Sequence, residues 1–176
     1  ENEVISASDL ESQLKRLGYT IRGMATSAEA ALDLIDQEQP DLILMDIVLG
    51  GKMDGIEAAT IIKDKWGIPV VFLTAYAEQT KLEQAKLTLP FGYLLKPFKP
   101  RDLKVTIEMA LYVAKEESER RKAEAKYRIF FDEGPDAVVV LDPSTARIIE
   151  FNDQACHQLG YSREEFSKLS VPDIEM

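Results

Sequence analysis

The stretch Pro40–Ile47, PDLILMDI, places four consecutive apolar residues directly before an aspartate, Asp46. The run Leu42–Met45 is continuously apolar and does not alternate with polar residues, which is typical of a strand covered on both faces. Two further segments have the same character: VVFLT ends at Thr74, and GYLLK ends at Lys96. A carboxylate, a hydroxyl and an ammonium group therefore stand at the ends of three predicted strands.

Between these strands, apolar residues recur at intervals of three and four, as they do on one face of a helix. The predicted helices are Leu10–Leu17, ended by Gly18; Ala28–Ile35, with Ser27 as N-cap; Ile56–Ile62; a weaker segment at about 78–87; and a long helix from about Arg101. A short strand is also predicted over Thr20–Ala25. This alternation favours a doubly wound α/β fold, a parallel sheet with helices on both faces. The carboxyl ends of its strands share one edge, so we expect Asp46, Thr74 and Lys96 to converge there.

Charge and composition limit the classes of function that the sequence can have. The 176 residues carry a formal net charge of −10, which disfavours nucleic-acid binding but suits divalent metal ions. Cys156 is the single cysteine, so no internal disulfide is possible, in keeping with a reducing compartment. No apolar run approaches ~18 residues and no signal-peptide pattern is visible. We therefore expect a cytoplasmic protein with no membrane span in this fragment.

The long helix becomes densely charged over Lys115–Arg128 and contains no Gly or Pro between Leu103 and Arg128. A weak heptad seam follows the residues Ile107, Leu111, Ala114, Ser118, Arg121 and Ala125. Because its later positions are small or polar, the segment is either a single solvated helix or one of a pair. Gly134-Pro135 ends the helix. After it we predict strands at Ala137–Leu141 and Arg147–Phe151 and short helices at Asp153–Leu159 and Arg163–Leu169.

Four motifs, in this order, resemble the receiver domains of response regulators. They are PDLILMDI with Asp46, MDGIEAA at Met53–Ala59, VVFLTA ending at Thr74-Ala75, and GYLLKPF at Gly92–Phe98. The resemblance covers residues 1–115 and implies a flavodoxin-like sheet of five strands in the order 2-1-3-4-5. It implies that Asp46 is the phosphoacceptor and that Thr74 and Lys96 contact the transferred phosphoryl group. Tyr93 matches the switching aromatic of the family, and the Lys96-Pro97 bond is expected to be cis.

The same resemblance implies a Mg²⁺ site, which departs from the family pattern. An acidic pair usually follows the first strand, and counting back from Gly18 places it on Glu1 and Asn2. The second acid is thus replaced by an amide. Asp46 and the backbone carbonyl of Val48 would complete the protein ligands.

The strand expected before the acidic pair is also absent from the sequence. We expect it to be missing from this fragment only. An alternative is that Val138–Val140 of another molecule fills its place in the sheet. A second departure is the loop Gly50–Lys52, GGK, where many receivers have a shorter loop with proline.

The C-terminal part resembles the beginning of a PAS sensor domain, on YRIFFDEGPDAVVVLD and on Asn152, Leu159–Ser162 and Glu164–Phe166. The expected organisation is a receiver at 1–115, a helical linker at 116–130 and the N-terminal part of a PAS domain at 131–176. Such a protein would take a phosphoryl group on Asp46 from a histidine kinase or phosphotransfer protein. It would pass the signal through the linker to a PAS-containing sensor, and its parent could itself be a histidine kinase.

The resemblance also favours a homodimer through the last receiver helix and the linker. The alternative function is a pseudo-receiver, a binding or dimerisation module that takes no phosphate, and Asn2 is its main support. A nucleotide-binding or hydrolytic enzyme is disfavoured, because the sequence has no glycine-rich phosphate loop and no Ser/His/Asp set.

Overall fold

The computed structural model describes residues 7–49, 52–75 and 91–169. Contacts between residues divide the chain into two units that meet between Glu117 and Ser118. Glu1 and Asn2 lie outside the described residues, as does the helix predicted at 78–87.

A parallel sheet forms the centre of the first unit. Its strands are β1 (Ile43–Asp46), β2 (Val70–Ala75) and β3 (Gly92–Lys96), in the order β1-β2-β3. The register places Asp46 beside Leu73 and Lys96 beside Ala75, so all three strands end at the same edge. The predicted α/β class with parallel strands is confirmed.

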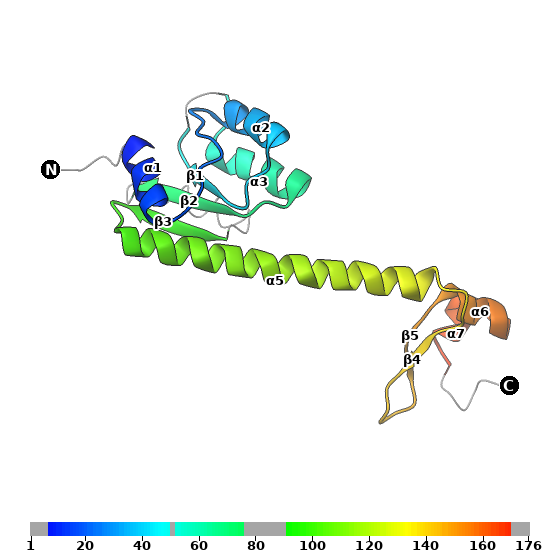
Figure 1. Cartoon of the computed structure of the whole chain (residues 1–176). Helices are drawn as coiled ribbons and strands as arrows, with labels where there is room; N and C mark the ends of the chain where they lie inside the picture. Colours follow the sequence, from blue (N-terminus) through cyan, green and yellow to red (C-terminus); the bar gives the residue numbers. More distant parts are fainter. Residues whose placement is uncertain (1–6, 50–51, 76–90, 170–176) are drawn as a thin grey trace. The chain divides into compact units, whose positions relative to one another are not determined.

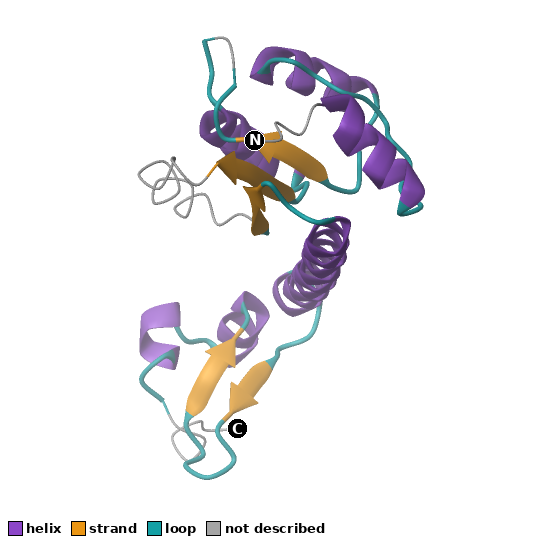
Figure 2. Cartoon of the chain, turned by 90° about the vertical axis from the view of Figure 1, so that its left-hand side faces the viewer, coloured by secondary structure: helices purple, strands orange, loops and turns teal. Residues whose placement is uncertain are grey.

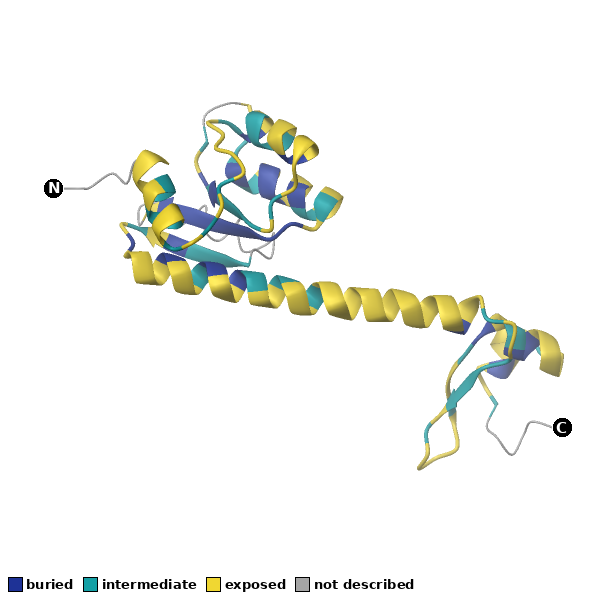
Figure 3. Ribbon diagram, in the orientation of Figure 1, coloured by how far each residue is buried: buried dark blue, intermediate teal, exposed yellow. Residues whose placement is uncertain are grey.

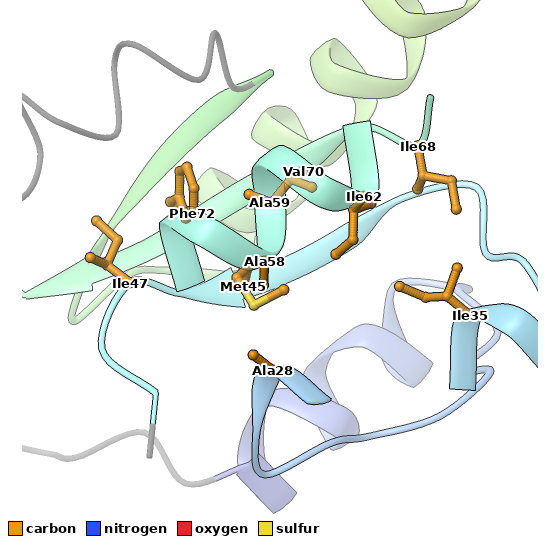
Figure 4. Packing of buried hydrophobic residues seen from close by; sticks show 10 residues of the cluster. All are labelled: Ala28, Ile35, Met45, Ile47, Ala58, Ala59, Ile62, Ile68, Val70 and Phe72. Atoms are coloured by element: carbon orange, nitrogen blue, oxygen red, sulfur yellow. The ribbon is translucent and has the colours of Figure 1, made fainter. Parts of the chain in front are cut away.

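Helices cover both faces of this sheet (Figure 1). Helices α2 (Ala28–Gln37) and α3 (Gly55–Trp66) pack on one face, where the cluster in Figure 4 includes Met45, Ile62 and Phe72. The other face, with Leu73 and Leu94, packs against the leucines of α1 (Ala7–Arg16) and the first turns of α5 (Pro100–Asp132). Along Leu42–Met45 the side chains alternate: Ile43 and Met45 join the first cluster, and Leu42 and Leu44 join the second. Continuous apolarity in the sequence thus reflects burial on both faces.

The strand predicted at Thr20–Ala25 does not form. In the described residues this segment is irregular and mostly exposed, and the described sheet has three strands where five were expected. A strand needs a neighbour that completes its hydrogen-bond ladder. In the expected order 2-1-3-4-5 that neighbour is the first strand, which is not among the strands of the described residues.

Helix ends follow the predicted signals. The Ser27 hydroxyl accepts a hydrogen bond from the backbone N–H of Ala30 and caps α2. Gly18 and Gly67 stand just after α1 and α3 with φ of 90° and 67°, a region that glycine enters without a steric penalty. The Lys96-Pro97 peptide is cis, as predicted.

The second unit contains the last turns of α5 and a small antiparallel sheet of β4 (Val139–Leu141) and β5 (Ile148–Phe151) (Figure 2). Helices α6 (Asp153–Leu159) and α7 (Arg163–Phe166) follow, and α7 is shorter than predicted. Phe166, Ala155 and Cys156 form the buried centre of this unit, with Phe151 and Tyr161 packed against them.

The predicted pairing seam on α5 requires a correction. Ile107 is 3% exposed and belongs to the core of the first unit, with Leu111 packed against that core. These residues face the sheet of their own domain and are not available to a second helix. Figure 3 shows that much of α5 is exposed. In the first unit its exposed large apolar side chains are Val105, Met109, Tyr112 and Val113, and its last turns expose Tyr127, Ile129 and Phe130.

Within the three described ranges, no helix combines the length and the apolar character that crossing a membrane requires.

Candidate functional site

Asp46 and Lys96 form an ion pair at the carboxyl edge of the parallel sheet. Asp46 is the last residue of β1 and Lys96 the last residue of β3, and 50 positions separate them in the sequence. The Lys96 Nζ atom donates a hydrogen bond to Asp46 Oδ2 at 2.5 Å. The convergence predicted from the strand ends is therefore present for the carboxylate and the ammonium group.

This pair remains accessible from solvent. The side chains of Lys96 and Asp46 are 31% and 34% exposed. An anionic group from another molecule can therefore reach the carboxylate beside a positive charge without a rearrangement of the core. The other carboxylate oxygen, Oδ1, accepts a hydrogen bond from the backbone N–H of Val48 at 3.1 Å. Both oxygens of Asp46 are thus oriented by the protein.

The first turn of α3 lies directly behind Asp46. The Gly55 N–H donates to the backbone carbonyl of Ile47 at 3.2 Å. A Cβ atom on Gly55 would lie 2.0 Å from the carbonyl oxygen of Asp46, closer than any side chain allows. Only glycine lets the helix approach the strand end to this distance.

A capping box holds that first turn. The Asp54 side chain accepts hydrogen bonds from the N–H groups of Ile56 and Glu57, both at 2.9 Å, and the Glu57 carboxylate accepts one from the Asp54 N–H. Reciprocal capping of this kind satisfies the free N–H groups at a helix start. It fixes the position of Gly55, and through Gly55 the backbone of Asp46.

Thr74 lies on β2 and Tyr93 on β3, two of the strands that end at the edge of the ion pair. Thr74 is one residue beyond the Leu73 partner of Asp46, is 1% exposed, and donates its hydroxyl hydrogen to the Ala75 carbonyl at 3.3 Å. Tyr93 lies earlier on β3, and its ring stacks on Phe72 with 5.9 Å between centroids. The aromatic ring therefore packs against the first core cluster.

The predicted metal ligands are only partly within the described residues. Asp46 offers a carboxylate and Val48 a backbone carbonyl, and such hard oxygen donors fit Mg²⁺, which keeps several waters in protein sites. In the described ranges no three His, Cys, Asp or Glu side chains are grouped so as to hold a metal ion. Glu1 and Asn2, which would add ligands, lie outside these ranges.

Sequence reasoning missed the roles of Gly55 and of the Asp54–Glu57 pair. The spacing Asp-x-x-Glu before an apolar run was a usable signal for the capping box. No sequence signal indicates the approach of Gly55 to Asp46, because that distance arises from the packing of α3 on β1.

Comparison with known proteins agrees with this geometry. Residues 1–108 match the family model described as response regulator receiver domain, and residues 125–175 match a PAS domain model. The chain is 37% identical over 111 residues to the transcriptional regulatory protein PdtaR of Mycobacterium tuberculosis, covering 63% of this chain and 54% of that protein. It is 32% identical over 123 residues to the phyllosphere-induced regulator PhyR of Methylorubrum extorquens, covering 69% and 45%. The chain thus spans about half the length of these curated relatives.

Solved structures are similar as well. The signal receiver domain of a modulated diguanylate cyclase from Desulfovibrio desulfuricans G20 superposes with a TM-score of 0.61 at 35% identity, over 66% of this chain and 93% of that one. The N-terminal domain of a response regulator/sensory box/GGDEF three-domain protein from Carboxydothermus hydrogenoformans gives 0.59 at 35%, over 67% and 94%. With the family model matching well over half of its length, the chain belongs to the response regulator receiver domain family.

Proposed function

We propose that Asp46 accepts a phosphoryl group from a phosphohistidine donor, a histidine kinase or a phosphotransfer protein. The observation that carries the proposal is the ion pair between Lys96 Nζ and Asp46 Oδ2 at an open sheet edge. A carboxylate with an adjacent cation is a nucleophile that can meet an anionic phosphoryl group without net repulsion. The membership in the receiver family supports the same role.

In the transfer, an oxygen of the Asp46 carboxylate forms a bond to phosphorus and the P–N bond to the donor imidazole breaks. The imidazole nitrogen keeps the electron pair of that bond. The product is an acyl phosphate, whose added negative charge stays next to the Lys96 ammonium group. Because the chemistry is mainly positioning and charge stabilisation, the protein has to hold Asp46 and Lys96 in place.

Mg²⁺ is the cofactor that this site suits. Asp46, the Val48 carbonyl, Glu1 and Asn2 would hold it, and it would supply further neutralisation of the phosphoryl oxygens. Asn2 contributes a neutral oxygen where the family pattern has a carboxylate, so we expect weaker binding.

Signal output would begin at Thr74 and pass along α5. In this proposal the Thr74 hydroxyl exchanges its Ala75 carbonyl contact for a phosphoryl oxygen, and Tyr93 changes its packing on Phe72 in response. The receiver at 1–115 would then act through the linker at 116–130 on the PAS segment at 131–176. The α5 helix, which is continuous from Pro100 to Asp132, supplies the covalent path.

A homodimer through α5 completes the proposal, with the contact surface moved to the exposed face. Val105, Met109 and Tyr112 follow one another at intervals of four and three, so they lie on one side of the helix. Met109 and Tyr112 are 58% and 61% exposed. Burying this row against a second copy would remove apolar surface from water, which favours association.

The experiment is incubation of the protein with acetyl phosphate and Mg²⁺, followed by intact-mass measurement. The wild type should gain the mass of one phosphoryl group, and Asp46→Asn should gain none. If the wild type gains none while remaining folded, the pseudo-receiver reading takes its place. If Asp46→Asn gains the same mass, another residue is the acceptor.

A further inference from the structure

Asn152 is a fully buried amide with four hydrogen-bond partners. Asn152 is 0% exposed, follows β5 directly and is the N-cap of α6. An uncharged amide offers two donors and an oxygen with two lone pairs, and burial is costly for any of these left without a partner. Here all four are used, which makes Asn152 the centre of a polar network beside the apolar core of the second unit.

The oxygen of the amide contacts two backbone N–H groups of the second unit. Asn152 Oδ1 accepts hydrogen bonds from the backbone N–H groups of Val138 and Ala155, both at 3.0 Å. The first partner stands just before β4 and the second lies in the first turn of α6. This half therefore joins the sheet to the following helix.

The donating half holds the end of α5. Asn152 Nδ2 donates to the backbone carbonyls of Phe131 and Asp136, both at 2.8 Å. Phe131 belongs to the last turn of α5, where carbonyls lack partners within the helix. The residue four positions later is Pro135, which has no N–H to offer. Asn152 thus supplies the donor that the helix end itself lacks.

One other contact attaches the same helix turns to β5. Phe131 is buried, and within α5 the Tyr127 ring stacks on it with 5.3 Å between centroids. The Tyr127 hydroxyl donates to Glu150 Oε2 at 3.0 Å. Partial burial raises the pKa of Tyr127, and the Glu150 acceptor raises it further, so the phenol remains a donor. This contact is exposed, whereas the Asn152 contact is buried.

We propose that Asn152 is the joint through which α5 acts on the β4–β5 sheet and α6. A shift or rotation of the α5 end moves the Phe131 carbonyl, and the Asn152 amide passes that movement to Val138 and Ala155. This inference rests on the proposed function, in which α5 carries the state of Asp46. It adds the residue at which the signal leaves the helix.

The test is backbone hydrogen exchange of the full chain, with and without acetyl phosphate and Mg²⁺, alongside intact mass. In the wild type, phosphorylation should change the exchange rates of the Val138 and Ala155 amides, whose side-chain acceptor is Asn152. If the chain gains a phosphoryl group while these two amides keep their exchange rates, the role proposed for Asn152 is wrong. The proposed function of Asp46 is not contradicted by that result. A folded chain that gains no phosphoryl group overturns both.

A matched variant separates the two halves of the amide. Asn152→Asp keeps an oxygen that accepts from Val138 and Ala155, but it cannot donate to Phe131 or Asp136. We expect amide exchange at the end of α5 to accelerate by on the order of tenfold, because two hydrogen bonds are lost. The response of the α6 amides to phosphorylation should disappear.

Tyr127→Phe is the control, since it removes another hydrogen bond between α5 and β5 and leaves Asn152 intact. It should respond to phosphorylation as the wild type does. A response in Asn152→Asp equal to that of the wild type overturns the proposal. Should Asn152→Asp lose protection throughout 137–169, the Val138 and Ala155 amides of the wild type decide the question without any variant.

Discussion

Gly55 lies so close to Asp46 that a methyl group on it would come within 2.0 Å of the Asp46 carbonyl oxygen. Gly55→Ala must therefore displace α3 or the end of β1. The atoms in the way belong to the backbone of Asp46 and Ile47, so the displacement costs free energy. We expect a loss of about 1–3 kcal/mol in the free energy of unfolding, as for other overpacked sites. Phosphorylation of Asp46 should also slow, because the carboxylate moves with its backbone. Thermal melts and acetyl phosphate kinetics measure the two effects.

Gly67→Ala is the matched control for that change. Gly67 has a φ of 67° and open space around its Cβ position, so alanine there costs only about 1–2 kcal/mol of left-handed backbone strain. Stability should fall while the phosphorylation rate stays at the wild-type value. Equal loss of rate in both variants would show that Gly55 acts through global stability alone.

Lys96→Met should reduce the phosphorylation rate by about two orders of magnitude, as removal of one stabilising charge or donor does in other active sites. The stability effect should be small, at most about 1 kcal/mol, because partly exposed ion pairs contribute little. Lys65→Met offers the comparison, since it removes a second Lys–Asp pair, to Asp36 at 3.1 Å, on the surface of the same unit. It should leave phosphorylation unchanged, and a rate loss there would contradict the special role of Lys96.

Tyr93→Leu should distinguish phosphorylation of Asp46 from the structural response that phosphorylation causes in the second unit. The Tyr93 ring stacks on Phe72 and packs against the first core cluster, so the phosphorylated mass should still appear at the wild-type rate. The change in hydrogen exchange over 118–169 that follows phosphorylation should be lost. Tyr93→Phe, which keeps the ring, should retain more of that change than Tyr93→Leu. Loss of phosphorylation itself in Tyr93→Leu would assign Tyr93 to the chemistry instead.

Met109→Lys should weaken self-association and leave the fold intact, because the side chain is already 58% exposed. Ile107→Lys should instead destabilise the first unit by more than about 3 kcal/mol, because it places an unpaired charge in a core position. Light scattering at high micromolar concentration and thermal melts distinguish the two outcomes. Ile61→Lys, an exposed apolar position on α3, is the control that should change neither. A wild-type protein that stays monomeric at that concentration would contradict the dimer.

Asn2→Asp should tighten Mg²⁺ binding by roughly one to two powers of ten, since it adds one unit of charge next to the cation. It should also speed phosphorylation and lower stability without metal, because carboxylates near Asp46 then repel one another. A Mg²⁺ titration and a metal-free melt of both proteins measure these effects. Equal Mg²⁺ affinity would mean that residue 2 is not a metal ligand.

The sequence by itself determined the three strands of the described parallel sheet and the residues at their ends. Leu42–Met45 and Val70–Leu73 are apolar throughout, and burial on two faces follows from that pattern. Parallel strands share a carboxyl edge, so Asp46 and Lys96 could be expected to meet. The cap at Ser27 and the stop at Gly18 are local, since a hydroxyl or a glycine acts within one helix turn.

Only the tertiary structure decided which side of α5 is buried. Apolar residues occur on more than one side of its first turns, so periodicity alone favoured Ile107 for pairing when Met109 is the exposed residue. The sheet decides which side is buried, because Ile107 packs with Leu73 and Leu94 in the second core cluster. The tertiary structure also decided the conformation of Thr20–Ala25. This segment is irregular because a strand there needs the hydrogen bonds of a neighbouring strand, whatever its own residues are. The same holds for Asn152, whose four partners are spread over 25 positions of the chain, from Phe131 to Ala155, and meet only on folding.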